Sequence, residues 1–203
     1  MVRPSPARLR RRSAILEAAG ALFVTGGVAA TSMEAIAERA GVSRATVFNH
    51  FGGKRELLLG LYDRQLDRLA ESLRTSSEQS NPRRAVAAFF RSAETVLRAD
   101  GDLTPLLIRE VLYDPALLAH DVARGDDVRR ELIDRVRAAQ RAGQLRRTVP
   151  ATQIAAIMMD LWTASLVPWV LAERRFGLAA HVMRKIRLVL RGLGADPREA
   201  SPR

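Results

Sequence analysis

Hydrophobic residues recur along most of the chain at the three- and four-residue spacing of amphipathic helices. The first such segment runs from about residue 8 to residue 24, and Ile15, Ala19 and Phe23 share one of its faces. No stretch maintains the alternation of apolar and polar residues that marks a half-buried strand. The pattern therefore predicts an all-α protein.

Glycine and proline residues divide the rest of the pattern into further helices. These are predicted at residues 31–40, 43–51, 54–73, 82–99, 104–112, 115–119, 126–142, 151–173 and 179–193. Pro168 is expected to kink or end the helix that contains it. The polar run 75–81 is predicted to be a linker, and the tail beyond residue 194 to be frayed. A basic arm is expected before the first helix, with Arg3, Arg8, Arg10, Arg11 and Arg12.

Residues 31–51 form the most informative segment, because their pattern predicts two short helices joined by a tight turn. Thr31 and Glu34 match a capping box at the start of the first helix. Gly41 stands where a sharp turn requires a positive φ, and Ser43 suits the N-cap of the second helix. A pair of this kind is either an ordinary αα-hairpin or a helix-turn-helix that binds DNA.

The second helix of this pair has one apolar and one polar face. Val47 and Phe51 are four residues apart and are expected to point inward. The opposite face is polar and small, as a helix in the DNA major groove requires, since the groove is about 12 Å wide. The residues expected to face DNA are Thr31, Ser32, Ser43, Arg44, Ala45, Thr46, Phe48, Asn49, His50 and Lys54.

Different members of this set suit different parts of the duplex. We expect Arg44 to donate two hydrogen bonds to guanine, and Asn49 to pair with adenine or to contact a phosphate. Thr46 suits a thymine methyl group or a phosphate. His50 and Lys54, together with Ser32 and the amide region of Thr31 in the preceding helix, are expected at phosphates.

Composition adds a basic charge and excludes several kinds of site. The formal net charge is +11, carried mainly by arginine, which favours a polyanionic partner or reflects ordinary solvated faces. Cysteine is absent, and the three histidines lie far apart, so no metal site and no cofactor are predicted. Neither a secretory signal nor an uninterrupted membrane span is evident, which favours a cytoplasmic protein without membrane contact.

The run from Thr31 to Leu58, with AERAGVSRATVFNHFGGKRELL at its centre, resembles the N-terminal domain of the TetR/AcrR repressors. The resemblance implies a homodimer whose two recognition helices enter successive major grooves of a palindromic, double-stranded operator. It also implies a DNA-binding domain at residues 1–53 and a larger helical domain at residues 54–203. Phe48 departs from the family pattern, which commonly has tyrosine there.

The larger domain is implied to bind a small-molecule effector and to form the dimer through its last two long helices. An apolar stripe in the last of these helices contains Val182, Ile186, Val189 and Leu193. The residues expected at the effector are Phe89, Arg109, Tyr113, Met158, Trp162, Ser165 and Trp169. Each of them taken singly also suits an ordinary core position.

Three functions fit these patterns to different degrees. The leading hypothesis is a repressor that binds its operator as a homodimer and is released by a small, mainly apolar effector. An architectural or constitutive DNA-binding regulator without a ligand is the second. The third is an all-α enzyme, which we disfavour because no catalytic signature stands at diagnostic spacing.

Overall fold

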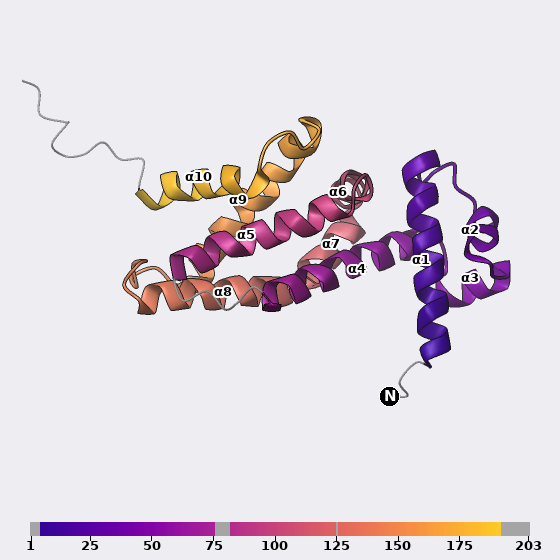
Figure 1. Ribbon diagram of the computed structural model, residues 1–203, viewed down its shortest axis with the longest axis horizontal. Helices are drawn as coiled ribbons and strands as arrows, with labels where there is room; N and C mark the ends of the chain where they lie inside the picture. The colour runs from indigo at the N-terminus through magenta and orange to yellow at the C-terminus, as the bar shows by residue number, and fades with distance from the viewer. Residues whose placement is uncertain (1–4, 76–81, 125, 192–203) are drawn as a thin grey trace, which may run out of the picture. The chain divides into compact units, whose positions relative to one another are not determined.

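The computed structural model describes residues 5–75, 82–124 and 126–191, and every regular element within them is a helix (Figure 1). The ten helices of this part of the chain are α1 (Pro6–Gly26), α2 (Met33–Ala40), α3 (Arg44–His50), α4 (Lys54–Thr75), α5 (Pro82–Ala99), α6 (Leu103–Tyr113), α7 (Pro115–Arg124), α8 (Asp126–Arg141), α9 (Ala151–Leu171) and α10 (Leu178–Arg191). The predicted all-α class is confirmed. The predicted linker falls largely, and the predicted tail wholly, outside the described residues.

Helix α1 begins earlier than its apolar pattern suggested. The Ser5 hydroxyl accepts a hydrogen bond from the Arg8 amide, and Pro6 occupies the first helical position, where its missing N–H costs nothing. Arg8, Arg10, Arg11 and Arg12 therefore lie in the first turns of a helix and not in an arm before it. Arg3 lies outside the described residues.

The start of α2 differs from the predicted capping box. Ser32 is the N-cap, and its hydroxyl accepts a hydrogen bond from the Ala35 amide at 3.0 Å. The Thr31 side chain is buried, and its hydroxyl donates to the Gly27 carbonyl oxygen at 2.8 Å. Carbonyl groups at the end of a helix lack partners within it, so they attract the Thr31 hydroxyl and leave the cap to the next residue.

The turn from α2 to α3 follows the sequence prediction closely. Gly41 has φ of 66°, the left-handed conformation that ends a helix at low cost. Ser43 caps α3 by accepting a hydrogen bond from the Thr46 amide at 3.1 Å. The two short helices are therefore fixed by local backbone chemistry on both sides of the turn.

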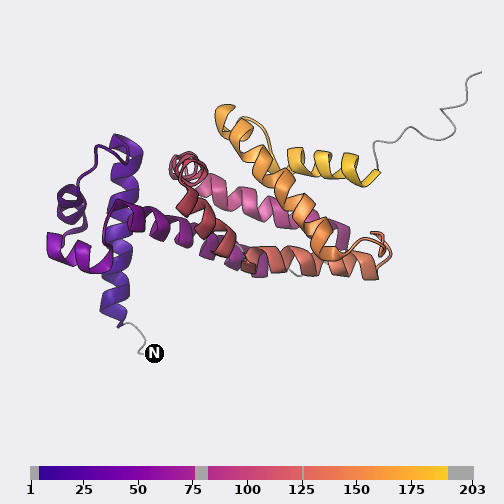
Figure 2. The ribbon, with the colours of Figure 1, turned by 180° about the vertical axis from the view of Figure 1, so that it is seen from behind.

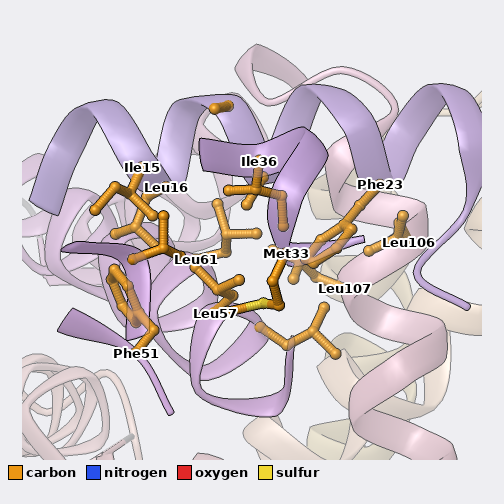
Figure 3. Packing of buried hydrophobic residues seen from close by; sticks show 14 of the residues in the cluster. Ile15, Leu16, Phe23, Met33, Ile36, Phe51, Leu57, Leu61, Leu106 and Leu107 are labelled. Carbon is orange, nitrogen blue, oxygen red and sulfur yellow. The ribbon is translucent and has the colours of Figure 1, made fainter. Parts of the chain in front are cut away.

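The chain divides into two compact units. The first contains Met1–Glu71 and Val96–Asp126. Its core joins α1, α2, α3, the start of α4, and α6, as Figure 3 shows. Gly60 permits close packing of α4, because a Cβ atom there would lie 2.9 Å from Leu16 Cδ2.

This packing unit does not end at the predicted boundary after residue 53. Leu57 and Leu61 of α4 and Leu106 and Leu107 of α6 belong to the same apolar cluster as Phe23 of α1 (Figure 3). The division into residues 1–53 and 54–203 concerns function, and it stays a prediction.

The second unit contains Ser72–Thr95 and Asp127–Arg203, and its described helices include most of α5 together with α8, α9 and α10. Helix α10 packs against α9 (Figure 2). The buried Arg135 of α8 donates to the carbonyl oxygens of Leu73 at 2.7 Å and Ala85 at 2.9 Å. Helix α9 runs through Pro168, which donates no helical hydrogen bond because it has no amide proton, and ends three residues later at Leu171.

Candidate nucleic-acid interface

Helix α3 is anchored through one face and open on the other. Val47 is fully buried, and Phe51, at the end of α3, is 3% exposed and lies in the core of the first unit (Figure 3). The remaining predicted contact residues of this segment are exposed or half-buried. They are Ser43, Arg44, Ala45, Thr46, Phe48, Asn49 and His50. The predicted orientation of α3 is thus confirmed, and the DNA contacts themselves stay predictions.

Arg44, at the first position of α3, is held by groups on two sides. Its Nε lies 2.6 Å from Oε1 of Glu34, which comes from α2. Its guanidinium carbon lies 5.2 Å from the centre of the Phe48 ring, in a cation–π contact. The sequence prediction placed Glu34 in the capping box and missed this ion pair, because a pair between two short helices depends on the angle at which they meet.

Two neutral polar residues complete the exposed face of α3. The Thr46 hydroxyl lies 2.8 Å from the Ser43 hydroxyl, so part of its hydrogen-bonding capacity is used locally. The Asn49 side chain is exposed and makes no hydrogen bond within the described part of the chain. Both the donor and the acceptor of its amide are therefore available to a base edge.

Two residues that were predicted to contact phosphates form hydrogen bonds within the protein. Lys54 Nζ donates to the carbonyl oxygens of Val28 at 2.9 Å and Ala29 at 2.7 Å, and so fastens the loop between α1 and α2. An ammonium group has three donors, so one remains for DNA. Thr31 is different, because its amide donates to Gly27 at 3.3 Å and its hydroxyl is also engaged. It retains no donor for a phosphate.

A group of arginines from α1, which we call the basic flank, lies near the end of α3. The basic flank consists of Arg8, Arg11 and Arg12. Burial lowers the pKa of His50 below its usual value, and the positive charges of these three arginines lower that pKa further. The Arg12 guanidinium carbon also lies 4.3 Å from the centre of the Phe51 ring. The sequence analysis expected these arginines in an arm before the first helix. Their position near the end of α3 follows from the early start of α1, which includes them in the helix.

Most of the predicted effector residues lie in the core of the second unit. Met158, Trp162, Ser165 and Trp169 form one buried face of α9. The Phe90 ring links this face to the predicted residue Phe89, since it lies 5.4 Å from the Trp162 ring and 5.1 Å from the Phe89 ring, centre to centre.

The remaining predicted effector residues do not join this group. Arg109 belongs to the first unit, and its side chain is 60% exposed and paired with Glu110. The Tyr113 side chain lies outside the described residues. Sequence reasoning missed Lys185, whose Nζ donates to the Ser165 hydroxyl at 2.9 Å. A hollow of about 310 Å³ in the second unit is basic and not apolar, with Arg137, Gln140, Arg141 and Arg147 around it.

Two capped short helices, with an anchored second helix that exposes a polar face beside a basic flank, define a helix-turn-helix DNA-binding protein. Residues 15–61 match the family described as bacterial regulatory proteins, tetR family. Residues 15–61 therefore form a DNA-binding domain of this family, and the chain is a DNA-binding transcriptional regulator.

Two relatives illustrate how far the similarity extends. The chain is 28% identical over 192 residues to the HTH-type transcriptional repressor KstR of Rhodococcus jostii, covering 95% of this chain and 86% of that protein. It is 40% identical over 88 residues to the HTH-type transcriptional activator FasR of Mycolicibacterium smegmatis, covering 41% of this chain and 40% of that protein. Proteins similar to this chain are thus named both as repressors and as activators.

Solved structures share the fold. Thermus thermophilus FadR, a TetR family repressor in complex with lauroyl-CoA, matches with a TM-score of 0.69 and 25% identity over 94% of this chain and 99% of that chain. The fatty acid degradation regulator FadR of Bacillus halodurans matches with a TM-score of 0.75 and 19% identity over 95% of this chain and 98% of that chain. Both matches extend well beyond the helix-turn-helix, so the helical arrangement of most of the chain is that of this family.

Proposed function

We propose that this regulator is a repressor that binds a palindromic operator as a homodimer and is released by a small, mainly apolar molecule. The observation that carries the proposal is the exposed polar face of α3, backed by the buried Val47 and Phe51. In this proposal residues 1–53 bind DNA, and residues 54–203 bind the effector and a second copy. The protein acts in the cytoplasm without a cofactor, a membrane contact or a catalytic role.

Exposed apolar side chains on α9 and α10 support the homodimer. They are Ile157, Val167, Leu171, Leu188 and Val189, with exposed fractions between 39% and 77%. An exposed apolar surface of this kind favours a protein contact. Helix α9 is also long and apolar enough to cross a membrane by length and composition alone. We assign its apolar surface to the second copy, because α9 packs on α10 and carries buried aromatic residues.

The effector proposal draws on the relatives and on the interior of the second unit. FadR of Thermus thermophilus was solved with lauroyl-CoA, and FadR of Bacillus subtilis with stearoyl-CoA. The aromatic interior around Phe89, Trp162 and Trp169 suits an apolar ligand. Such a ligand would favour a dimer whose recognition helices no longer match successive major grooves, which lie about 34–36 Å apart.

The test of operator binding compares the DNA upstream of the protein's own gene with a random duplex at moderate salt. We expect a preference of about 10³-fold or more for the upstream DNA. Equal binding to both duplexes would contradict the proposal.

The test of the effector uses the fluorescence of the two tryptophans, Trp162 and Trp169, during titration with long-chain acyl compounds. We expect a compound that changes the fluorescence also to weaken operator binding. If no compound changes either signal, the constitutive regulator without a ligand is favoured instead.

A further inference from the structure

The guanidinium group of Arg44 is presented in one orientation by its two neighbours. Oε1 of Glu34 lies 2.6 Å from Nε of the group, and the guanidinium carbon lies over the Phe48 ring, 5.2 Å from its centre. Glu34 lies on α2, so the ion pair spans the turn between the two short helices. Arg44 and Glu34 have side chains that are 65% and 57% exposed, and both are therefore accessible to DNA.

The two terminal nitrogens of Arg44 make no hydrogen bond within the described part of the chain. A guanine is read by two parallel N–H donors to O6 and N7. Because the Glu34 carboxylate lies against the Nε side of the group, the pair available for this contact is the terminal one. The carboxylate thus selects which edge of the guanidinium group meets the base.

We propose that Glu34 is a specificity-determining residue that positions Arg44 for base reading, with the Phe48 ring as the second support. The inference rests on the proposed operator binding and deepens it. An arginine side chain is flexible, so holding it in a binding geometry reduces the entropy lost when the base contact forms. This role also gives Phe48 a function that needs no hydroxyl group.

The negative charge of Glu34 also favours the operator over random DNA. A carboxylate on the DNA-facing side repels phosphates whatever the base sequence, so it weakens binding to every duplex. The contact to one base pair is strengthened only through Arg44. Together the two effects raise the ratio of operator affinity to random-DNA affinity.

The chain provides a matched control for the charge effect. Glu38 lies on the same helix and is exposed, and its side chain has no partner within the described residues. Glu34→Ala and Glu38→Ala therefore remove the same charge from α2, and only Glu34→Ala removes the contact with Arg44. Phe48→Leu, which removes the second support, keeps the inference testable if Glu34→Ala is unstable.

The experiment begins by selecting a preferred site from a randomised duplex pool with the full-length wild-type protein. Affinities are then measured for that site, for each of its single base-pair variants and for random duplex. We expect Arg44→Ala to lose about 5- to 150-fold of preference at one base pair. We expect Glu34→Ala and Phe48→Leu to lose about 2- to 5-fold at that same base pair, and Glu38→Ala to lose none. Both glutamate variants should bind random duplex more tightly.

A double-mutant cycle completes the test. In the Arg44→Ala background, Glu34→Ala should cause no further loss of preference at that base pair. If Glu34→Ala and Glu38→Ala keep the same preference at every base pair, the positioning role is overturned while operator binding stands. If the wild-type protein selects no site, the proposed operator binding is overturned and this inference with it.

Discussion

At the scale of single residues, local chemistry was easier to predict than contacts between distant segments. Gly41 and Ser43 act where the sequence placed them, because a turn and a cap are decided within a few residues. The ion pair of Arg44 and the hydrogen bonds of Lys54 were missed, because their partners come from other helices or loops. Thr31 does not cap α2 as predicted, because its hydroxyl donates to carbonyl groups at the end of α1.

The role of Lys54 gives a prediction about stability. Lys54→Met should lower the free energy of unfolding by about 1–2 kcal/mol, because it removes two charge-assisted hydrogen bonds to the loop between α1 and α2. Thermal unfolding followed by circular dichroism measures this. Arg39→Met is the control, since Arg39 is exposed and has no partner within the described residues. If Lys54→Met leaves the free energy of unfolding unchanged, the two hydrogen bonds do not stabilise the protein, and DNA binding is the remaining role for this lysine.

His50 gives a prediction about pH. Its pKa in the free protein is lowered by burial and by the basic flank. DNA phosphates offset those positive charges, so the pKa of His50 should rise on binding and the complex should take up a proton. Operator affinity should therefore strengthen as pH falls from about 8 to about 6, and His50→Asn should flatten this dependence. His181→Asn is the control, because His181 also has a lowered pKa but belongs to the second unit.

At the scale of whole elements, periodicity placed all ten described helices, and the differences lie at their ends. Helix α7 runs to Arg124 and not to residue 119, because no helix-breaking residue occurs before Gly125. What periodicity did not indicate is how helix ends are joined. The buried Arg135 links the end of α4 and the start of α5 to α8, and in the sequence it looks like the other arginines of α8, which are not buried.

Arg135 gives a prediction about the second unit. Arg135→Met should lower the free energy of unfolding by about 3–5 kcal/mol, because it leaves the Glu131 carboxylate and two backbone carbonyl groups without this partner. Arg137→Met on the same helix should cost less than about 1 kcal/mol, since Arg137 is exposed and paired with Asp134 at the surface. Chemical denaturation of the two variants compares them directly. If both variants lose a similar free energy of unfolding, the buried contacts of Arg135 contribute no more to stability than the surface ion pair of Arg137.

At the scale of the molecule, the fold class and the family were accessible from the sequence, and the packing units were not. The helix-turn-helix is a local motif with its own turn and cap signals. The inclusion of α6 in the first unit depends on contacts such as those of Leu106 and Leu107, which lie far along the chain from their partners. No local pattern carries that information. The effector site stays a prediction, and for most of its residues the sequence offers no pattern that separates a ligand contact from an ordinary core position.

The proposed homodimer gives a prediction at this scale. Leu188→Glu should convert the protein to a monomer and weaken operator binding by at least about tenfold, because a buried, unpaired carboxylate opposes the contact between two copies. Analytical ultracentrifugation and DNA binding measure the two effects. Leu112→Glu is the control, since Leu112 is similarly apolar and exposed but lies on α6. A dimer that survives Leu188→Glu would place the interface elsewhere.

The internal hydrogen bonds of the two lysines have a consequence for covalent modification. Lys54 holds backbone carbonyl groups, and Lys185 holds the Ser165 hydroxyl, so both side-chain amines of the chain are engaged. Acetylation of either lysine would loosen a loop or a helix contact and would leave the arginines of the DNA-binding face charged. Amine-directed acylation would therefore lower the stability of this protein, and at Lys54 it would also remove one positive charge from the DNA-binding side, while the arginines there keep theirs.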